Sequence, residues 1–241
     1  RPNSLIAGCG TGQHSIETAA TFRNSKILAV DLSLTSLAYA KRKTQEYGFK
    51  NIEYMPADIL NLGKYKEQFD IVESVGVLHH MSDPMAGWKM ITSCVKPGGL
   101  IKIGLYSEIA RRTIAKIRGE IRQRKSGWTD KAMKAFRREV VKSEKKHLRE
   151  LGSYTDFYST SELRDLLFHV QEHRFTLIQI KKCISTLGLE FCGFESSDLM
   201  KSFAREYSEP GDLYNLDKWN SYEELHPTAF RNMYQFWCQK S

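Results

Sequence analysis

The stretch LIAGCGTGQ, residues Leu5 to Gln13, decides the fold. It places three glycines within five positions, directly after a short apolar run. Glycines allow a ligand to approach the backbone closely, and the start of a following helix offers unpaired N–H groups to that ligand. The stretch therefore predicts a strand, a glycine loop and a helix N-terminus that together hold a nucleotide-bearing ligand.

The spacing of these glycines differs from that of a dinucleotide fingerprint. That fingerprint, G-x-G-x-x-G, uses its third glycine for close helix-to-strand packing beside a pyrophosphate. Here the glycines are Gly8, Gly10 and Gly12, and Gln13 stands where the third glycine of the fingerprint belongs. The loop therefore favours a ligand without a diphosphate.

The chain from Leu5 to Ser107 alternates short β-branched runs with helical patterns, which is typical of βαβ units and a parallel sheet. Strands are expected at 4–7, 26–31, 52–56, 70–74 and 100–106, with helices at 12–22, 33–48 and 83–95 between them. Later in the chain the pattern indicates helices at 159–170 and 176–187 and strands at 189–195 and 233–239. The predicted fold class is α/β, with a doubly wound, mostly parallel seven-stranded sheet.

A helical insertion is expected after the fifth strand. Apolar residues recur at helical spacing there, which predicts two basic amphipathic helices separated by a break at KSGWT, residues 125–129. We expect residues 107–175 to form this insertion and to act as a lid. Residues 1–106 and 176–241 then form the core, with an irregular helical excursion at about 196–228.

The positive charge of the chain is concentrated in this insertion. Residues 108–150 hold fifteen Lys and Arg against six Asp and Glu, whereas the whole chain carries a net charge of +8. Such a segment attracts the phosphates of a nucleic acid, an anionic membrane surface or a phosphorylated small molecule. The alternative is a solvated face of two lid helices, because acids are interleaved and only Trp128 and Phe136 accompany the charge.

Cysteine usage and hydropathy exclude some classes of protein. The five cysteines are scattered, odd in number and without a CxxC pair, which fits a reducing compartment and predicts a cytoplasmic location. No apolar stretch approaches the roughly 20 residues of a transmembrane segment. The abrupt start, with three residues before the first expected strand, predicts a domain of a longer polypeptide.

Two acidic residues follow predicted strands at the edge where ligands bind in open α/β folds. Asp31 ends the second strand, where a carboxylate can accept both hydroxyls of a ribose. Asp58 follows the third strand, where it could receive the amino group of an adenine while Ile59 packs on the ring. The alternatives are a helix cap for Asp31 and an Asx-type turn for Asp58.

Together these features resemble the class I S-adenosylmethionine-dependent methyltransferases. The segments that carry the likeness are LIAGCGTGQH, AVDLSLTSLAYAKRKT, GVLHHMSDPMAGW, GLYSEIARR, LLFHVQEHR and MYQFWCQK. They look most like the bacterial methyltransferase domains that follow tetratricopeptide repeats in longer proteins. The resemblance implies S-adenosylmethionine as cofactor, S-adenosylhomocysteine as product, and a repeat region N-terminal to this domain in the parent chain.

The resemblance also implies which residues hold the cofactor. The glycines line its methionine and ribose side, Asp31 holds the ribose, and Asp58 with Ile59 holds the adenine. The full set of expected cofactor-binding residues is Ala7, Gly8, Gly10, Gly12, Gln13, Asp31, Leu32, Asp58, Ile59, Ser74 and Val75.

Methyl transfer is an in-line displacement that needs a general base only when the acceptor must lose a proton. His79 and His80 follow the fourth strand and Tyr106 ends the fifth, so these three are the candidate catalytic residues. His79 is the expected general base, with Tyr106 and His14 as second candidates. The alternative for the histidine pair is packing in the loop. The loop lacks the Asn/Asp-Pro-Pro-Tyr/Phe motif of enzymes that methylate planar amino groups, which disfavours such acceptors.

The motif HVQEH, residues 169–173, has the spacing of an inverted zinc-protease signature. In such a site two histidines four apart on a helix bind zinc, and the glutamate activates water. We instead expect His169, Glu172 and His173 to contact the acceptor, and no metal. The sequence thus predicts methyl transfer to an undetermined acceptor, with a non-catalytic cofactor-binding module and a zinc hydrolase as alternatives.

Overall fold

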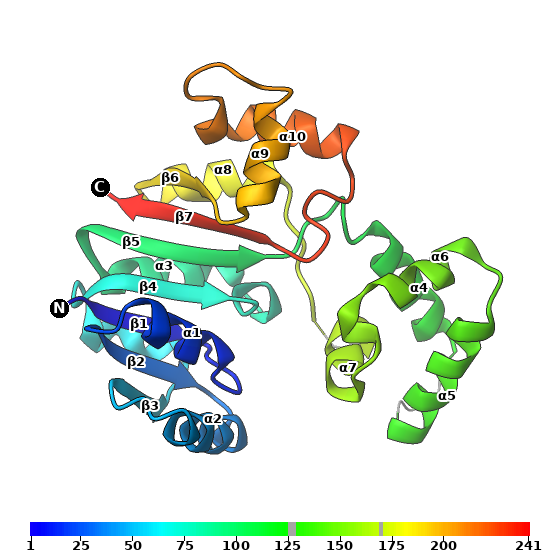
Figure 1. Cartoon of the computed structure of the whole chain (residues 1–241), viewed down its shortest axis with the longest axis horizontal. Coiled ribbons are helices and arrows are strands. Elements are labelled where there is room, and N and C mark those ends of the chain that lie inside the picture. Colours follow the sequence, from blue (N-terminus) through cyan, green and yellow to red (C-terminus); the bar gives the residue numbers. More distant parts are fainter. Residues whose placement is uncertain (125–128, 169–170) are drawn as a thin grey trace.

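The computed structural model describes residues 1–124, 129–168 and 171–241. Within them lies a seven-stranded sheet of order β3-β2-β1-β4-β5-β7-β6 (Figure 1). The strands are β1 (Asn3–Ala7), β2 (Lys26–Asp31), β3 (Ile52–Pro56), β4 (Phe69–Val75), β5 (Val95–Leu105), β6 (Leu189–Phe194) and β7 (Tyr234–Lys240). The first five strands pair in parallel, and β7 runs antiparallel to both its neighbours. The predicted mostly parallel α/β sheet is confirmed.

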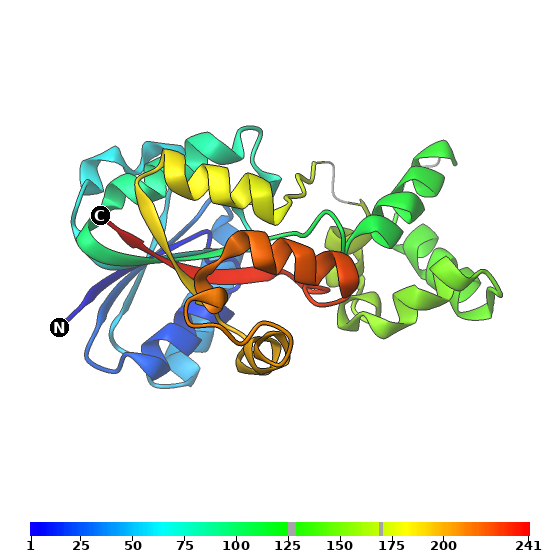
Figure 2. The ribbon, with the colours of Figure 1, turned by 90° about the horizontal axis from the view of Figure 1, so that it is seen from above.

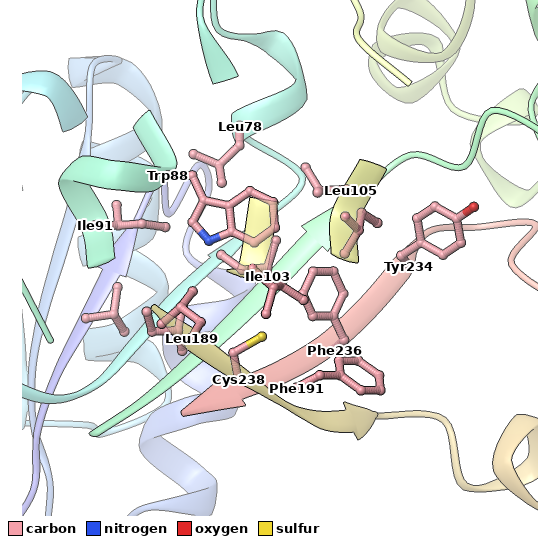
Figure 3. Packing of buried hydrophobic residues seen from close by; sticks show 14 of the residues in the cluster. Leu78, Trp88, Ile91, Ile103, Leu105, Leu189, Phe191, Tyr234, Phe236 and Cys238 are labelled. Carbon is pink, nitrogen blue, oxygen red and sulfur yellow. The ribbon is translucent and has the colours of Figure 1, made fainter. Parts of the chain in front are cut away.

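Helices cover both faces of the sheet. They are α1 (Gln13–Thr21), α2 (Leu34–Glu46), α3 (Pro84–Cys94), α8 (Leu177–Thr186), α9 (Ser197–Ala204) and α10 (Leu216–Leu225). Figure 2 shows α3 and α8 on one face, with α1 and α2 on the other. The main hydrophobic core lies under α3 and α8, where the fully buried Trp88 packs against Ile103 and Phe236 (Figure 3).

Local signals set the helix ends. Ser33 and Asp83 cap α2 and α3 as expected, because each side chain accepts hydrogen bonds from backbone N–H groups of the first turn. Thr176 and Gln179 form a capping box at the start of α8.

The structure differs from the expected strand limits at β5. This strand begins at Val95, five residues before the expected start at Leu100, because Val95 already pairs with Phe69 of β4. The register shifts between Phe69 and Ile71, so the glycine turn lies inside the bounds of the strand.

The segment after β5 has its own hydrophobic core. It contains α4 (Arg112–Gln123), α5 (Asp130–Lys142), α6 (Lys146–Arg149) and α7 (Thr160–Phe168), joined by short 3₁₀ turns at Glu150–Ser153 and Thr155–Phe157. Buried side chains such as Ile117, Phe136 and Leu166 form a cluster separate from that of the sheet. The two predicted basic helices are present as α4 and α5. Most of the expected break at 125–129, and the end of the helix expected at 159–170, lie outside the described residues.

Buried polar contacts join the base of this segment to the sheet. Ser107 forms a bridge with Phe175, and Glu223 of α10 accepts hydrogen bonds from the hydroxyls of Ser107 (2.5 Å) and Tyr234 (2.6 Å). Glu223 is fully buried, and this burial raises the pKa of its carboxyl.

No helix among the described residues is both long and apolar enough to cross a membrane.

The raised pKa of Glu223 predicts a pH-dependent stability. The folded chain binds the Glu223 proton more tightly than the unfolded chain, so this residue's contribution to stability is full at low pH and is lost as pH rises above about 4.5. We expect the unfolding free energy of the wild type, relative to that of Glu223→Gln, to fall as pH rises. Urea denaturation measures both values. Glu224→Gln, on the exposed side of α10, is the matched control. A difference that is constant with pH would contradict the assignment.

Candidate functional site

A cavity of about 710 Å³ opens at the carboxyl edge of β1, β2, β3 and β4. The expected cofactor residues that line it are Gly8, Gly10, Gln13, Asp31, Leu32, Asp58, Ile59 and Val75. Ala7, Gly12 and Ser74 are not part of its lining. His14, a second catalytic candidate, also lines it, and Cys9 and Met81 line it without having been expected there. The structure thus brings most of the predicted residues together, and their roles toward a ligand stay predictions.

The glycine loop is held against β2 by its own backbone. The N–H groups of Gly8 and Cys9 donate to the carbonyl of Val30 at 2.8 and 2.9 Å. Gly8 has a positive φ of 83°, and a Cβ on it would lie 2.4 Å from Val77 Cγ2. This position therefore requires glycine on both counts.

Gly12 serves packing instead of lining the cavity. Its φ is 87°, and a Cβ on it would lie 2.6 Å from the Cβ of Ala40 in α2. A larger residue at position 12 would push the start of α1 away from α2. Ala7 and Ser74 also support the site from behind, because the Ser74 hydroxyl donates to the Ala7 carbonyl and joins β1 to β4.

Asp31 links the loop to the end of β2. Its Oδ2 accepts a hydrogen bond from the Gly10 N–H and its Oδ1 accepts one from the Ser33 N–H, both at 2.8 Å. The side chain that caps α2 belongs to Ser33, so the helix-cap alternative for Asp31 does not describe its contacts. A carboxylate offers about four acceptor positions, so Asp31 keeps capacity for ligand hydroxyls.

Asp58 forms a turn of the kind expected as the alternative to ligand binding. Its Oδ1 accepts a hydrogen bond from the Leu60 N–H at 2.9 Å and caps a short 3₁₀ helix, Ile59–Tyr65. This contact uses one oxygen of the carboxylate, and Asp58 still lines the cavity. Turn formation and ligand binding are therefore compatible at this residue.

Cys9 brings a thiol to the cavity wall. Burial, together with the nearby Asp31 carboxylate, raises the pKa of this thiol to about 12. The neutral thiol is a poor nucleophile at physiological pH. Cys9 thus contributes a small, uncharged surface to the cavity.

His14 and Glu73 form a polar pair that the motif analysis did not connect. His14 Nε2 lies 3.3 Å from the Glu73 carboxylate, and His14 Nδ1 lies 3.6 Å from that of Glu17 at the rim. Glu73 lies on β4, is 3% exposed and also accepts a hydrogen bond from the Thr18 hydroxyl at 2.9 Å. The neighbouring cation on β5, Lys102, pairs with Glu195 on its other side. This part of the site is rich in negative charge and suits a positively charged ligand group.

The three candidate catalytic residues lie at different depths. His80 lines the cavity, whereas His79 is fully buried behind it. The His79 ring lies 3.9 Å from the Tyr106 ring and 4.3 Å from the His80 ring, measured between centroids. The guanidinium carbon of Arg111 lies 3.5 Å from the centroid of the Tyr106 ring. The geometry therefore gives His80 the direct access to a ligand.

The HVQEH segment has a different conformation from the zinc alternative. Residues 171–174 are not helical, so the zinc alternative, which needs two histidines one turn apart on a helix, does not fit at His173. His169 lies outside the described residues. Across the described parts of the chain, no group of His, Cys, Asp and Glu could hold a metal ion.

Glu172 instead binds two arginines. Arg118 lies in α4, and Arg111 immediately precedes that helix. Arg111 donates from Nε and Nη2 to the two carboxylate oxygens at 3.2 and 3.0 Å, and Arg118 donates from Nη1 at 2.7 Å. Glu172 and Arg111 are each 2% exposed. Glu172 is thus committed to an internal ion cluster, and acceptor contact by Glu172 and His173 stays a prediction. The sequence signal for the cluster was the position of Arg118 among the apolar residues of α4, with Arg111 three residues before Ile114.

The same segment contacts the loop after β4. The His173 N–H donates to the His79 carbonyl at 2.8 Å, and the Gln171 side-chain amide donates to the Met81 carbonyl at 3.3 Å. His80 Nδ1 lies 3.0 Å from the Gln171 carbonyl. The segment that leaves the insertion therefore fixes the histidine pair at the edge of the cavity.

Comparisons with known proteins agree with this geometry. Residues 5–99 match the family described as "Methyltransferase domain". An uncharacterized protein of Synechococcus is 28% identical over 235 residues, which cover 92% of this chain and 56% of that protein. A ubiquinone biosynthesis O-methyltransferase of Coxiella burnetii is 32% identical over 95 residues, 39% of each chain. This chain therefore spans about half or less of the length of these relatives.

A solved structure shows a similar fold. PKMT2 from Rickettsia typhi, in complex with AdoHcy, has a TM-score of 0.74 at 16% identity. The match covers 98% of this chain and 48% of that one. The likeness therefore extends over the insertion as well as the sheet.

The His14–Glu73 pair predicts a ligand-selective effect. We expect His14→Ala to weaken binding of S-adenosylhomocysteine about fivefold or more, through loss of a polar contact to its amino-acid end. Binding of 5′-methylthioadenosine, which lacks that end, should not change. Asp31→Ala is the matched control, since both ligands contain the ribose and should both bind more weakly. Calorimetry measures all four affinities, and an equal loss of both ligands in His14→Ala would contradict the role.

Proposed function

We propose that this chain, which carries a class I S-adenosylmethionine-dependent methyltransferase domain, transfers a methyl group to an acceptor at the carboxyl edge of its sheet. The cofactor of this domain is S-adenosylmethionine and its product is S-adenosylhomocysteine. The acceptor, and the activity of the whole protein to which the domain belongs, are the parts that the proposal adds.

One observation carries the proposal: the order of polar groups along the edge of the sheet. Asp58 follows β3, Asp31 ends β2, the glycine loop follows β1, and the His14–Glu73 pair joins α1 to β4. The sheet order places these strands side by side. This order supports binding of adenine, ribose and amino acid in turn, with the sulfonium directed toward the end of β4.

The chemistry at that end needs positioning more than covalent help. S-adenosylmethionine supplies an electrophilic methyl group on a positively charged sulfur. The acceptor lone pair forms the new bond as the carbon–sulfur bond breaks, and the sulfur keeps the bonding electrons. Val75, Gly76 and Val77 line the cavity at this end and give it an uncharged wall.

His80 is our proposed general base. Its Nδ1 lies 3.0 Å from the Gln171 carbonyl, and a carbonyl oxygen only accepts hydrogen bonds. Nδ1 must therefore carry the proton of the neutral ring, which makes Nε2 the basic nitrogen. His79 and Tyr106 are positioning residues in this proposal. Their rings pack together next to His80, and the Arg111 guanidinium packs on the Tyr106 ring.

We propose that residues 107–175 form a lid over the acceptor. This lid is tied to the site by Arg111 and by residues 171–175. The missing planar-amine motif favours a hydroxyl or an acidic carbon as acceptor. Relatives whose names state O-methyl transfer match 39% of the chain, which supports an oxygen. The cytoplasmic location and the preceding tetratricopeptide repeats stay predictions of the sequence.

The alternatives differ in support. A zinc hydrolase gains none from the described residues, since Glu172 is bound by arginines. A module that binds the cofactor without turnover shares every cofactor contact. Transfer of a labelled methyl group to an acceptor distinguishes an enzyme from such a binding module.

The experiment is a labelled-methyl transfer screen over phenols, carboxylic acids and proteins. We expect the wild type to label one class. For that acceptor, His80→Gln should lower kcat about a hundredfold while S-adenosylhomocysteine affinity stays within about twofold, because a base acts only in the transition state. His226→Gln, a half-exposed histidine on α10's C-terminal side, is the matched control. No labelling of any class, with intact cofactor binding, would contradict methyl transfer in favour of the binding module.

A further inference from the structure

The outer face of α5 carries a row of exposed cations. They are Lys131, Lys134, Arg138 and Lys142, at steps of three and four residues that place them on one side of the helix. At a rise of about 1.5 Å per residue the row spans roughly 16 Å. No ion pair within the described residues involves any of the four. The row is therefore a line of uncompensated charge.

The acids of the insertion are largely used elsewhere. Glu120 pairs with His147, Asp130 with Arg164 and Glu139 with Arg124, and Glu150 accepts a hydrogen bond from Thr113. Asp130 and Glu139 are thus paired with arginines, and none of these four contacts involves the row. The interleaved acids that favoured a merely solvated face therefore do not balance the charge of α5.

The surface beside the row is concave as well as positively charged. Lys131, Lys134, Arg137 and Arg138 line a shallow hollow of about 470 Å³. A hollow whose lining consists of cationic residues suits an anionic group such as a phosphate.

The backbone of an exposed tyrosine, Tyr158, lies next to Arg137 of this hollow. Arg137 Nη1 donates to the Tyr158 carbonyl at 2.7 Å, which places Tyr158 beside α5. The Tyr158 side chain is 65% exposed, and its hydroxyl donates to the Gly152 carbonyl at 2.8 Å. The ring is thus both accessible and held in place, as a base-stacking platform must be.

We propose that this surface, the α5 row together with Tyr158, binds a single-stranded nucleic acid through its phosphates and one stacked base. The combination of a cationic track and an aromatic platform is what such ligands require. The four cations are about 4.5 to 6 Å apart along the helix axis, so one extended strand can bring a phosphate to each of them.

The observations favour a nucleic acid over a membrane surface. A helix that lies in a membrane interface buries its apolar face among the lipids. In α5 that face is used already, because Met133, Phe136 and Val140 are buried inside the insertion. Val141 is exposed but is a single residue. The surface therefore offers charge and stacking without an apolar face for lipids.

The surface is separate from the cofactor cavity. Figure 1 shows α5 in the part of the insertion that lies away from the sheet. The proposal goes beyond methyl transfer and does not depend on it. Variants of α5 should therefore leave S-adenosylhomocysteine affinity unchanged, which provides an internal check on folding.

The experiment measures fluorescence anisotropy of a labelled single-stranded RNA of about 20 nucleotides, titrated with the whole chain at several salt concentrations. We expect the fourfold variant Lys131→Gln, Lys134→Gln, Arg138→Gln and Lys142→Gln to bind at least about tenfold more weakly. Its salt dependence should fall by roughly three units of slope, since each lost phosphate contact on a single strand removes about 0.7.

The matched control removes the same charge from the sheet domain. It carries Arg23→Gln, Lys41→Gln, Lys50→Gln and Lys66→Gln, all exposed residues in the part of the chain outside the insertion. This control should bind RNA within about threefold of the wild type, because its charges act only at long range.

A second pair of variants tests the stacking platform. Tyr158→Ala should weaken RNA binding about fivefold or more, whereas Tyr158→Phe keeps the ring and should retain binding. Thermal unfolding of both variants shows whether the insertion stays folded.

Three results would overturn the proposal. The first is equal weakening in the α5 variant and the control, and the second is unchanged RNA binding in the α5 variant. The third is sedimentation with vesicles of about one-third phosphatidylserine, lost in the α5 variant, while RNA is not bound. That outcome would assign the row to a membrane surface instead.

Discussion

The hydrogen bonds between the glycine loop and the end of β2 are the constraint on which the site depends. Gly8 and Cys9 donate to Val30, and Gly10 donates to Asp31. These bonds fold the chain back sharply after β1 and point the start of α1 at the cavity. Because the loop backbone must pass close to Val77, only glycine fits at position 8. The cavity therefore exists because of local backbone geometry and not because of any single ligand-binding side chain.

A second set of contacts connects the insertion to that cavity. Arg111 contacts both Glu172 and the Tyr106 ring, and Tyr106 packs on His79. The returning segment then hydrogen-bonds the histidine loop from the other side. Movement of the insertion would thus be transmitted to His80. With the lid and base roles that we propose, this connection would couple substrate binding to chemistry.

The sequence predicted those features that depend on local patterns. Strand periodicity located β2 and β3 to the residue, and the capping side chains of Ser33 and Asp83 marked two helix starts. The glycine loop with the two acids predicted the cavity. These signals are local because strand alternation, caps and tight turns depend on neighbouring residues.

Contacts between distant residues escaped that reasoning. Glu172 meets Arg111 across 61 residues, and Thr18 meets Glu73 across 55. The HVQEH pattern left a helical metal pair open as an alternative, but residues 171–174 are not helical and Glu172 pairs with Arg111 and Arg118. Likewise the depth of His79 depends on packing against Tyr106, which spacing along the chain does not encode. A crystal structure with S-adenosylhomocysteine tests the central claim most directly. The account predicts adenine beside Asp58, both ribose hydroxyls on Asp31 and the amino acid beside His14, whereas a ligand in the reverse direction, or a cavity that excludes it, would contradict the account.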